Sequence, residues 1–544
     1  MARLIDGKEQ KKLDQAFCEK TGLPMLTLME QAANEMTGEI ASSLFVETYI
    51  HVLVVTGSGN NGGDGWASAR QLMAKGCRVI VYDAAPDASL TKDAAAQREA
   101  FHRMGGTVIT DAAGVEGEKI LVVLDALFGT GFSAARPLDS ATKAAFALMK
   151  KMPEAGAKVL ACDVPSGLDA KTGAVIPETV KADMTVTFGR NKVGLVTHPG
   201  CLYSGRVVCA PISMTDAFVD EVLGEERISA LDGDIINPIL PPRPKDAHKG
   251  QFGKALLIGG AEGMIGALIL AARACAKSGA GYTMLRAPES SLPVLASAVP
   301  SALISAVPTG KDTTKRDLPD PTVIAIGPGA GDAPWVTKAL SHLLLHDVPL
   351  VIDADGLNAL ARMPNASELF EKRAALGAPP VVLTPHPGEF RRLAPDLAET
   401  LDADRIEAAR ALARRWKVIV VLKGMATVIA LPDGRVWINT TGNSGLAKAG
   451  SGDVLTGMIA GLIAQSPLKD GDQMPLNEVM QQTLEGAVAR AVYAHGMAAE
   501  FATEECDEEF GVMPEDIINA IRIALSATYY NGSFHRCSSG LNFL

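Results

Sequence analysis

Short apolar runs alternate with helix-favouring segments along most of this 544-residue chain. In the first half the runs are His51–Gly57, Val79–Tyr82, Ile120–Leu124, Val159–Cys162 and Met184–Phe188. Strands that alternate with helices are typical of a parallel sheet with helices on both faces. The pattern therefore predicts a Rossmann-like α/β domain with three layers in the first half of the chain.

A second alternating series begins after the proline-rich stretch NPILPPRPKDAHKGQFG. Its apolar runs are Ala255–Ile258, Val323–Ile326, Leu350–Ile352, Val381–Leu383, Val418–Leu422 and Val428–Leu431. This series predicts a second α/β domain, with the boundary between Met214 and Asp232. We expect domains at 1–218 and 228–527, and a loose tail at 528–544.

Charge and cysteine usage limit the expected partners. The net charge of −11 argues against a non-specific nucleic-acid binder, which usually carries a basic face. The most apolar stretch, Ala255–Ala276, is interrupted by glycines, Glu262 and Arg273, so it does not resemble a membrane span. The eight cysteines form no C-x-x-C pair, which indicates reduced thiols. We expect a cytoplasmic homo-oligomer that binds neither nucleic acid nor membrane.

A glycine-rich segment, TGSGNNGGDG, follows the first apolar run at Thr56–Gly65, and a helix is predicted at Ala67–Ala74. Such a turn lets bare backbone approach a ligand, and the helix N-terminus offers unpaired N–H groups to phosphate. The spacing differs from the usual dinucleotide fingerprint. A simple tight turn is the alternative, although the inserted Asn and Asp side chains favour a binding site.

Two other strand ends carry carboxylates. Asp125 ends the apolar run of ILVVLDALFGTG, and Asp163 follows the run of VLACDVPSGLD. Ligands of open α/β sheets lie beyond the carboxyl ends of the strands, so these groups can meet at one site. Carboxylate, amide and carbonyl oxygens also make a plausible site for a hard cation.

The motifs GSGNNGGDG, DALFGTG and DVPSGLD resemble the N-terminal domain of the YjeF family, the NAD(P)H-hydrate epimerases, over roughly Leu13 to Pro211. The resemblance implies that Asp163 is the acid–base group and that K⁺ is held by Asn61, Asp125 and Ser166. The residues implied to contact the hydrated nucleotide are Asn60, Asn61, Gly62, Gly63, Asp64, Gly129, Thr130, Gly131, Phe132, Ser133, Ala134, Ala135 and Asp163.

One departure from the family concerns the loop after GTG. Family members often carry a basic residue there, whereas this chain has Phe132, Ser133, Ala134 and Ala135 before Arg136. The second acid–base partner of Asp163 is therefore left unassigned.

A second glycine-rich segment, GNSGLAKAGSGDVL at Gly442–Leu455, precedes an apolar helix. The first N–H groups of that helix can form an anion hole, and Asp453 can take a proton from an attacking hydroxyl. An ordinary helix N-cap is the alternative role for Asp453. No Walker sequence occurs, which excludes a P-loop enzyme.

Two further segments accompany this loop. LTPHPGEF places His386 between two prolines at a strand end, and VLKGMAT places Lys423 at another. A structural histidine and a solvated surface lysine are the alternative interpretations.

Together with HKGQFGKALLIGG, IGPGAG and DADGLNAL, these motifs resemble the C-terminal domain of the YjeF family over roughly Ile228 to Leu525. That domain is an ADP-dependent NAD(P)H-hydrate dehydratase with a ribokinase-like α/β fold, and the resemblance implies ADP as co-substrate with Mg²⁺. The residues implied to surround the hydrated nucleotide are Ala267, Gly329, His386 and Asp453. Those implied to bind ADP or AMP are Lys423, Gly424, Met425, Ala426, Thr427 and Gly452.

The glycine run itself departs from the family, since AKAGSGD stands where AKGGTGD is usual. Ala449 would cost energy if its backbone had to be left-handed.

The two resemblances together imply an enzyme that repairs hydrated NADH and NADPH. The first domain would interconvert the R and S hydrates, and the second would dehydrate the S form with ADP, giving AMP and phosphate. Two alternatives remain. The second domain could be a ribokinase-like small-molecule kinase, and the first could be a non-catalytic nucleotide-binding or assembly module.

Overall fold

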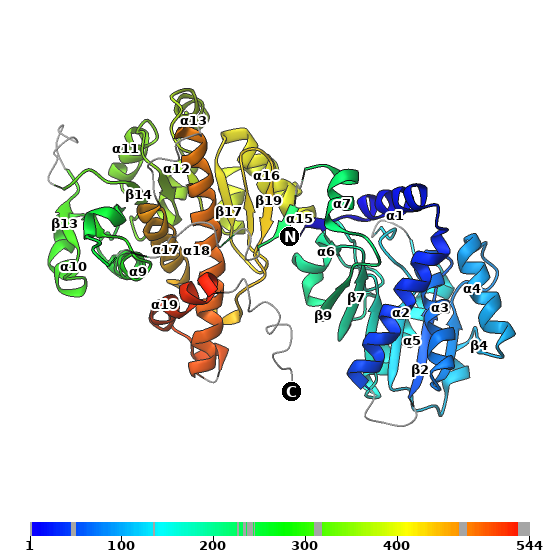
Figure 1. The fold of residues 1–544 in the computed structure, drawn as a ribbon. Coiled ribbons are helices and arrows are strands. Elements are labelled where there is room, and N and C mark those ends of the chain that lie inside the picture. The colour runs from blue at the N-terminus through cyan, green and yellow to red at the C-terminus, as the bar shows by residue number, and fades with distance from the viewer. Residues whose placement is uncertain are drawn as a thin grey trace. The chain divides into compact units, whose positions relative to one another are not determined.

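The computed structural model describes residues 3–44, 50–133, 137–225, 228–231, 236, 243, 245–308, 318–466, 476–506 and 508–530. The chain divides into two compact units, Met1–Ile228 and Ser229–Leu544 (Figure 1). Within the described residues, no helix combines the length and the apolar character needed to cross a membrane.

The first unit is built on a seven-stranded parallel sheet with the order β4-β3-β2-β5-β6-β7-β9. Its strands are β2 (His51–Thr56), β3 (Arg78–Asp83), β4 (Thr107–Ile109), β5 (Val122–Ala126), β6 (Lys158–Cys162), β7 (Met184–Phe188) and β9 (Arg206–Ala210). The helices include α1 (Gly7–Thr21), α2 (Met25–Leu44), α3 (Asn60–Ala74), α4 (Lys92–Arg103), α5 (Ser140–Glu154) and α7 (Asp216–Leu223).

Both faces of this sheet are buried. Along β2, Val52 and Val54 join a core with Trp66 of α3, whereas Leu53 and Val55 join a second core with Phe146 of α5. Successive side chains of a strand point to opposite faces, so one apolar run supplies both cores. The three-layer α/β prediction is confirmed.

The second unit has a ten-stranded sheet with the order β10-β19-β18-β17-β16-β15-β14-β11-β12-β13. It is parallel from β17 to β13, while β17–β18 and β18–β19 are antiparallel pairs. Its strands are β10 (Ile228–Ala230), β11 (Lys254–Ile258), β12 (Tyr282–Ala287), β13 (Leu303–Ala306), β14 (Val323–Ile326), β15 (Leu350–Ile352), β16 (Val382–Leu383), β17 (Ile419–Leu422), β18 (Val428–Ala430) and β19 (Val436–Ile438).

Helices cover this sheet too, which confirms the second α/β prediction. The helices that matter for the site are α9 (Ile265–Lys277), α12 (Ala354–Ala361), α14 (Pro387–Leu393), α16 (Arg405–Trp416), α17 (Ser451–Gln465), α18 (Leu476–Cys506) and α19 (Pro514–Tyr530). Apart from its first turn, α17 is buried along almost its whole length between α9 and α18.

The predicted loose tail is wrong in its first residues. Helix α19 continues to Tyr530, and 531–544 lie outside the described residues.

Candidate active sites

A cavity of about 790 Å³ opens at the carboxyl ends of the strands of the first unit. Helices α1 and α2, the start of α3 and the turn after β5 line it. The predicted residues found there are Asn60, Asn61, Asp64, Gly129, Thr130, Gly131, Phe132 and Asp163. Gly62, Gly63 and Ser133 are not among the lining residues, and Ala134 and Ala135 lie outside the described residues.

The glycine-rich segment is not the open turn that its sequence predicts. Helix α3 already begins at Asn60, so the predicted start at Ala67 is wrong. A Cβ on Gly62 would lie 2.0 Å from the carbonyl oxygen of Gly57, and one on Gly63 would lie 2.5 Å from a Met29 carbon. These glycines let the first turn of the helix approach its neighbours, and its first N–H groups remain unpaired within the helix at the edge of the cavity.

Asp163 is held by a buried ion pair. Its backbone has φ +65°, and its Oδ1 accepts hydrogen bonds from Lys192 Nζ at 2.6 Å, Thr187 Oγ1 at 3.0 Å and the Phe188 N–H at 3.2 Å. Lys192, on the short strand β8 (Asn191–Lys192), is fully buried. The other oxygen, Oδ2, takes no hydrogen bond from the described residues. The carboxylate is thus fixed on one side and open to the cavity on the other.

Sequence reasoning missed Lys192. The available signal was a lysine in the run GRNKVGL directly after a buried strand, where a charged side chain needs a partner.

Two more carboxyl groups line the same cavity. Asp14 of α1 accepts a hydrogen bond from Gln10 Nε2 at 2.7 Å, and burial raises the pKa of its carboxyl to about 6. Burial, followed by the charges of Asp163 and Asp14, raises the pKa of Asp64 well above its usual value, although Lys192 opposes the shift. Asp64 was predicted as a nucleotide contact, whereas Asp14 was not singled out.

The three residues assigned to K⁺ by resemblance meet around the turn after β5. The Ser166 N–H donates to Asp125 Oδ2 at 2.8 Å, and Ser166 Oγ also donates to that carboxylate. The Phe128 N–H donates to Ser166 Oγ at 2.8 Å, and Asn61 Nδ2 donates to the Phe128 carbonyl at 2.9 Å.

Two observations fit a hard cation there. Asn61 Oδ1 is buried without a hydrogen-bond partner in the described structure, and Asp125 is buried, which raises the pKa of its carboxyl. Carboxylate, hydroxyl, amide and carbonyl oxygens are the donors that such a cation takes. Among the described residues no group of three His, Cys, Asp or Glu side chains is placed to hold a metal.

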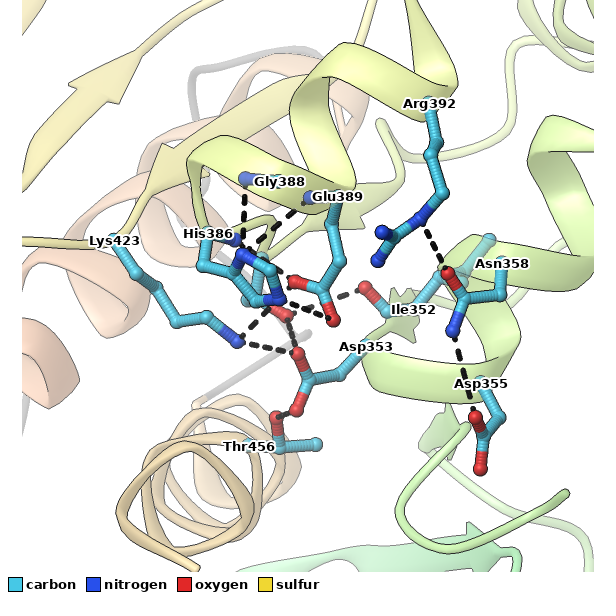
Figure 2. Close-up of polar contacts among 11 residues, drawn as sticks. Ile352, Asp353, Asp355, Asn358, His386, Gly388, Glu389, Arg392, Lys423 and Thr456 are labelled. Carbon is cyan, nitrogen blue, oxygen red and sulfur yellow. Dashed lines mark hydrogen bonds and ion pairs between the residues drawn. The ribbon is translucent and has the colours of Figure 1, made fainter. Parts of the chain in front are cut away.

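In the second unit, hydrogen bonds to Asp353 link the ends of three strands to a helix (Figure 2). Its Oδ1 accepts hydrogen bonds from Thr384 Oγ1 and Lys423 Nζ, each at 2.8 Å, and its Oδ2 accepts from Thr456 Oγ1 at 2.7 Å. Asp353 is buried after β15, Thr384 and Lys423 follow β16 and β17, and Thr456 lies on α17. Sequence reasoning missed Asp353, although it begins the motif DADGLNAL.

Lys423 is not the solvated lysine of the alternative interpretation. Its Nζ also lies 3.8 Å from Glu389 Oε2, and a Cβ on Gly452 would lie 3.3 Å from it. Burial alone would lower the pKa of Lys423, but the charges of Asp353 and Glu389 outweigh burial and raise it. A permanent ammonium therefore lies beside the N-terminus of α17.

Asp453 is not an N-cap, so that alternative is wrong. The N-cap of α17 is Gly450, and Asp453 is the third residue of the helix. Burial raises the pKa of Asp453 to about 7, Asp353 adds to the rise, and Lys423 opposes it. Gly450 has φ +100°, whereas Ala449 is not among the residues with positive φ, so the alanine costs no left-handed strain.

His386 caps helix α14. Its Nδ1 accepts hydrogen bonds from the backbone N–H groups of Gly388 at 3.0 Å and Glu389 at 3.4 Å, and the backbone N–H of His386 donates to Glu389 Oε2 at 2.8 Å (Figure 2). The imidazole is nevertheless 52% exposed. With Nδ1 accepting, the proton of the neutral ring resides on Nε2, which lies 3.5 Å from Glu389 Oε1.

The remaining predicted residues form two groups. Gly329 has φ +56°, and a Cβ there would lie 3.1 Å from the Ala267 Cβ, so these two residues touch. In the loop before β18, Gly424 has φ +138° and Ala426 has φ +53°. Thr427 Oγ1 donates to the Gly424 carbonyl at 2.8 Å, and Met425 is exposed.

Comparison with known families assigns both halves of the chain. The profile described as YjeF-related protein N-terminus matches residues 25–194, and the profile described as NAD(P)H-hydrate dehydratase matches residues 255–522.

Full-length relatives agree with these matches. The Bifunctional NAD(P)H-hydrate repair enzyme Nnr of Moorella thermoacetica is 35% identical over 96% of both chains, and that of Thermofilum pendens is 36% identical over 95% of both. The Escherichia coli enzyme of the same name is 31% identical over 92% of this chain and 90% of its own. The solved ADP/ATP-dependent NAD(P)H-hydrate dehydratase of Bacillus subtilis, co-crystallised with ATP/Mg²⁺, is 32% identical over 55% of this chain and 98% of its own, with a TM-score of 0.46. From the full-length relatives, this chain belongs to the family of bifunctional NAD(P)H-hydrate repair enzymes.

Proposed function

We propose that the two units carry out successive steps of one repair. The first interconverts the R and S forms of hydrated NADH and NADPH, and the second dehydrates the S form with ADP to give NADH or NADPH, AMP and phosphate. The observation that carries this proposal is the presence, in one chain of this family, of a carboxylate-lined cavity in one unit and an aspartate beside a helix N-terminus in the other.

In the second unit, Asp453 takes the proton of the hydrate's hydroxyl while the phosphoryl group of ADP is transferred to that oxygen. The unpaired N–H groups at the start of α17 and the ammonium of Lys423 stabilise the charge on the transferring group. The phosphate then leaves with the oxygen, a ring proton is lost, and the nicotinamide double bond re-forms. A base with a pKa of about 7 suits this task at neutral pH.

The nucleotide contacts of this site follow from the resemblance. Ala267, Gly329 and His386 would surround the hydrated nicotinamide, and residues 423–427 with Gly452 would bind ADP. Mg²⁺ is proposed to arrive on the ADP phosphates, since this ion usually keeps several waters and binds through phosphate and few protein ligands. No residue is assigned to it.

In the first unit, Asp163 is proposed as the acid–base group, with nucleotide contacts from residues 60–64 and 129–135. Asn61, Asp125 and Ser166 are proposed to hold K⁺, supported by the unpartnered buried oxygen of Asn61. The ion would fix the turn after β5 against the start of α3. The alternative of a small-molecule kinase leaves this cavity without a role.

The domain limits of 1–218 and 228–527, the cytoplasmic location and the homo-oligomeric state remain predictions. Size-exclusion chromatography with light scattering tests the last of them.

The deciding experiment supplies pure R or pure S hydrate to the purified protein with ADP and Mg²⁺. NADH and AMP should appear in equal amounts from either epimer. A kinase would instead give a stable phosphorylated product and no NADH. Asp163→Asn should reduce the recovery of NADH from R hydrate to the spontaneous rate, while S hydrate is still consumed normally. Equal consumption of R hydrate by this variant would make Asp163 structural.

A further inference from the structure

Epimerisation of the hydrate requires two proton-transferring groups. The reacting carbon is bonded to both the ring nitrogen and the hydroxyl, so the hydroxyl proton must be removed and the nitrogen must receive one when the ring opens. Asp163 supplies one group, and the four residues that follow the GTG motif, Phe132 to Ala135, include no basic side chain. The side chains that line the cavity are the described candidates for the second group.

The environment of Asp163 suits the proton acceptor. Lys192, Thr187 and the Phe188 N–H all donate to its Oδ1, an arrangement made for a carboxylate. Its Oδ2 takes no hydrogen bond from the described residues and remains available to a substrate hydroxyl.

The environment of Asp14 suits the proton donor. This carboxyl lines the same cavity from α1. The single hydrogen bond described for it comes from Gln10, which is only 6% exposed and fixes its orientation. Burial raises the pKa of Asp14 to about 6, so that both protonation states are accessible near neutral pH. Two carboxyl groups with different surroundings in one cavity are typical of an acid–base pair.

Resting on the epimerase function proposed above, we propose that Asp14 is the second acid–base residue of this site and acts together with Asp163.

Each proton and electron pair in the cycle has a destination. Asp163 takes the hydroxyl proton, the O–H electron pair forms the C=O bond, and the C–N bond breaks. The electron pair of the C–N bond goes to the ring nitrogen, which takes the proton of Asp14. After rotation of the aldehyde, the nitrogen attacks the other face of the carbonyl, Asp14 recovers its proton, and the oxygen recovers one from Asp163. No oxidant, reductant or further reactant is needed.

The charged groups around Asp14 are few. On α1 itself, Lys11 and Glu19 line the cavity, and the pKa of the Cys18 thiol is raised by burial first and then by the charges of Asp14, of Asp93 on α4 and of Glu19. From other elements Asp64, Asp163 and Lys192 act on this region, and α7 contributes Glu221, which is paired with Lys20. The cavity-lining residues of α2 are uncharged: Met25, Leu28, Met29 and Ala32.

Asp64 is the rival candidate. Burial raises its pKa well above the usual value, and no hydrogen bond from the described residues orients its carboxyl group. Asp14, whose carboxyl group is oriented by Gln10, is therefore the better placed of the two for proton transfer.

The test follows epimerisation of pure R hydrate without ADP, by chromatographic separation of the epimers, with the spontaneous rate subtracted. Asp14→Asn should slow epimerisation by about 10²–10⁴-fold. Glu35→Gln, which removes an exposed carboxylate on α2, should leave the rate unchanged. ADP-dependent turnover of S hydrate should match the wild type in both proteins.

A pH profile separates catalysis from structure. Because the protonated form of Asp14 is the donor, wild-type kcat/KM should fall above about pH 6, and Asp14→Asn should lose this descending limb. The Gln10 hydrogen bond lowers the pKa of Asp14, so Gln10→Leu should move the limb to higher pH. Gln10 Oε1 is buried without a partner, so leucine removes no other described hydrogen bond there.

Wild-type epimerisation by Asp14→Asn, an unchanged limb in that variant, or an unshifted limb in Gln10→Leu would each overturn the role of Asp14. If Asp64→Asn, rather than Asp14→Asn, loses both the epimerase activity and the descending limb, the role belongs to Asp64 instead. If the wild-type protein itself fails to epimerise the hydrate, the function proposed for the first unit is wrong, which is a separate result.

Discussion

A lysine–aspartate pair occurs in each unit, but the two pairs leave different carboxylates available for chemistry. In the first unit the paired aspartate, Asp163, itself lines the cavity. In the second, the paired Asp353 is buried and the nearby Asp453 takes no hydrogen bond from the described residues. A carboxyl group with a pKa near 7 beside a fixed ammonium is a marker of a functional site.

Asp453→Asn should nearly abolish dehydration and leave epimerisation intact. Asparagine keeps the shape of the side chain but cannot accept the hydroxyl proton, so a loss of about 10²–10⁴-fold is expected. In the wild type only the ionised form is active, so kcat/KM for S hydrate should rise with pH through about 7 and then level off.

Asp402→Asn, an exposed carboxylate paired with Arg391, is the matched control and should behave as the wild type. A normal dehydration rate in Asp453→Asn would remove Asp453 from the mechanism.

Asp353→Asn should move the rising limb of this profile to lower pH. The negative charge of Asp353 raises the pKa of Asp453, and without that charge the ammonium of Lys423 acts on Asp453 less opposed. Thr384→Val removes one hydrogen bond to Asp353 but no charge, and it should leave the limb in place. A limb that is unchanged in both variants would contradict the electrostatic coupling.

Asp125→Ala should abolish the potassium dependence of epimerisation. The variant removes the only charge among the three proposed ligands, so K⁺ should no longer raise the melting temperature of the first unit, as it should in the wild type. Tetramethylammonium chloride at equal ionic strength is the control. If neither protein responds to K⁺ in melting or in rate, the cation assignment is wrong.

At the scale of elements, the sequence predicted the order of strands and helices and the convergence of motifs at strand ends. Glycine-rich segments and aspartates after apolar runs are local signals, so Asn61, Asp125, Asp163 and Asp453 could be chosen from them. The pairing of Lys192 with Asp163 could not be predicted in this way, because it depends on packing against a strand end far from Lys192 in the sequence.

The start of α3 could not be predicted either. The segment NNGGDG has a low helix propensity. Tertiary packing overrides this low propensity, because the glycines have no side chain and let Gly57 and Met29 pack closely against the helix. Likewise Asp14 lies on an otherwise ordinary amphipathic helix, and only the cavity shows what it faces.

Gly62→Ala should therefore destabilise the first unit by about 1–3 kcal/mol, since its Cβ would meet a backbone carbonyl at 2.0 Å. Gly38→Ala, in the middle of α2 with nothing within 4 Å, should stabilise it by about 0.5–1 kcal/mol. Calorimetry of the full chain measures both changes in the free energy of unfolding. The transition that shifts in Gly38→Ala identifies the unfolding of the first unit. Equal and small effects would show that the close approach at Gly62 is not essential.

At the scale of the whole molecule, each unit has its own sheet, its own cores and its own candidate site. No residue proposed for one reaction comes from the other unit. The S hydrate made by the first site can therefore reach the second through solvent, and the two activities should be separable by single substitutions.

A mixture of Asp163→Asn and Asp453→Asn proteins should consequently convert R hydrate to NADH with ADP, although neither does so alone above the spontaneous rate. The Asp453→Asn protein makes S hydrate, and the Asp163→Asn protein dehydrates it. A lag in NADH formation should shorten as the Asp453→Asn protein is increased, because S hydrate must first accumulate in solution. The double variant, which carries both substitutions in one chain, should be inactive at any concentration. Suppose the mixture stays at the spontaneous rate while each variant retains its remaining single activity. Transfer between the sites would then require both active units in one chain, and release of the S hydrate into solution would be excluded.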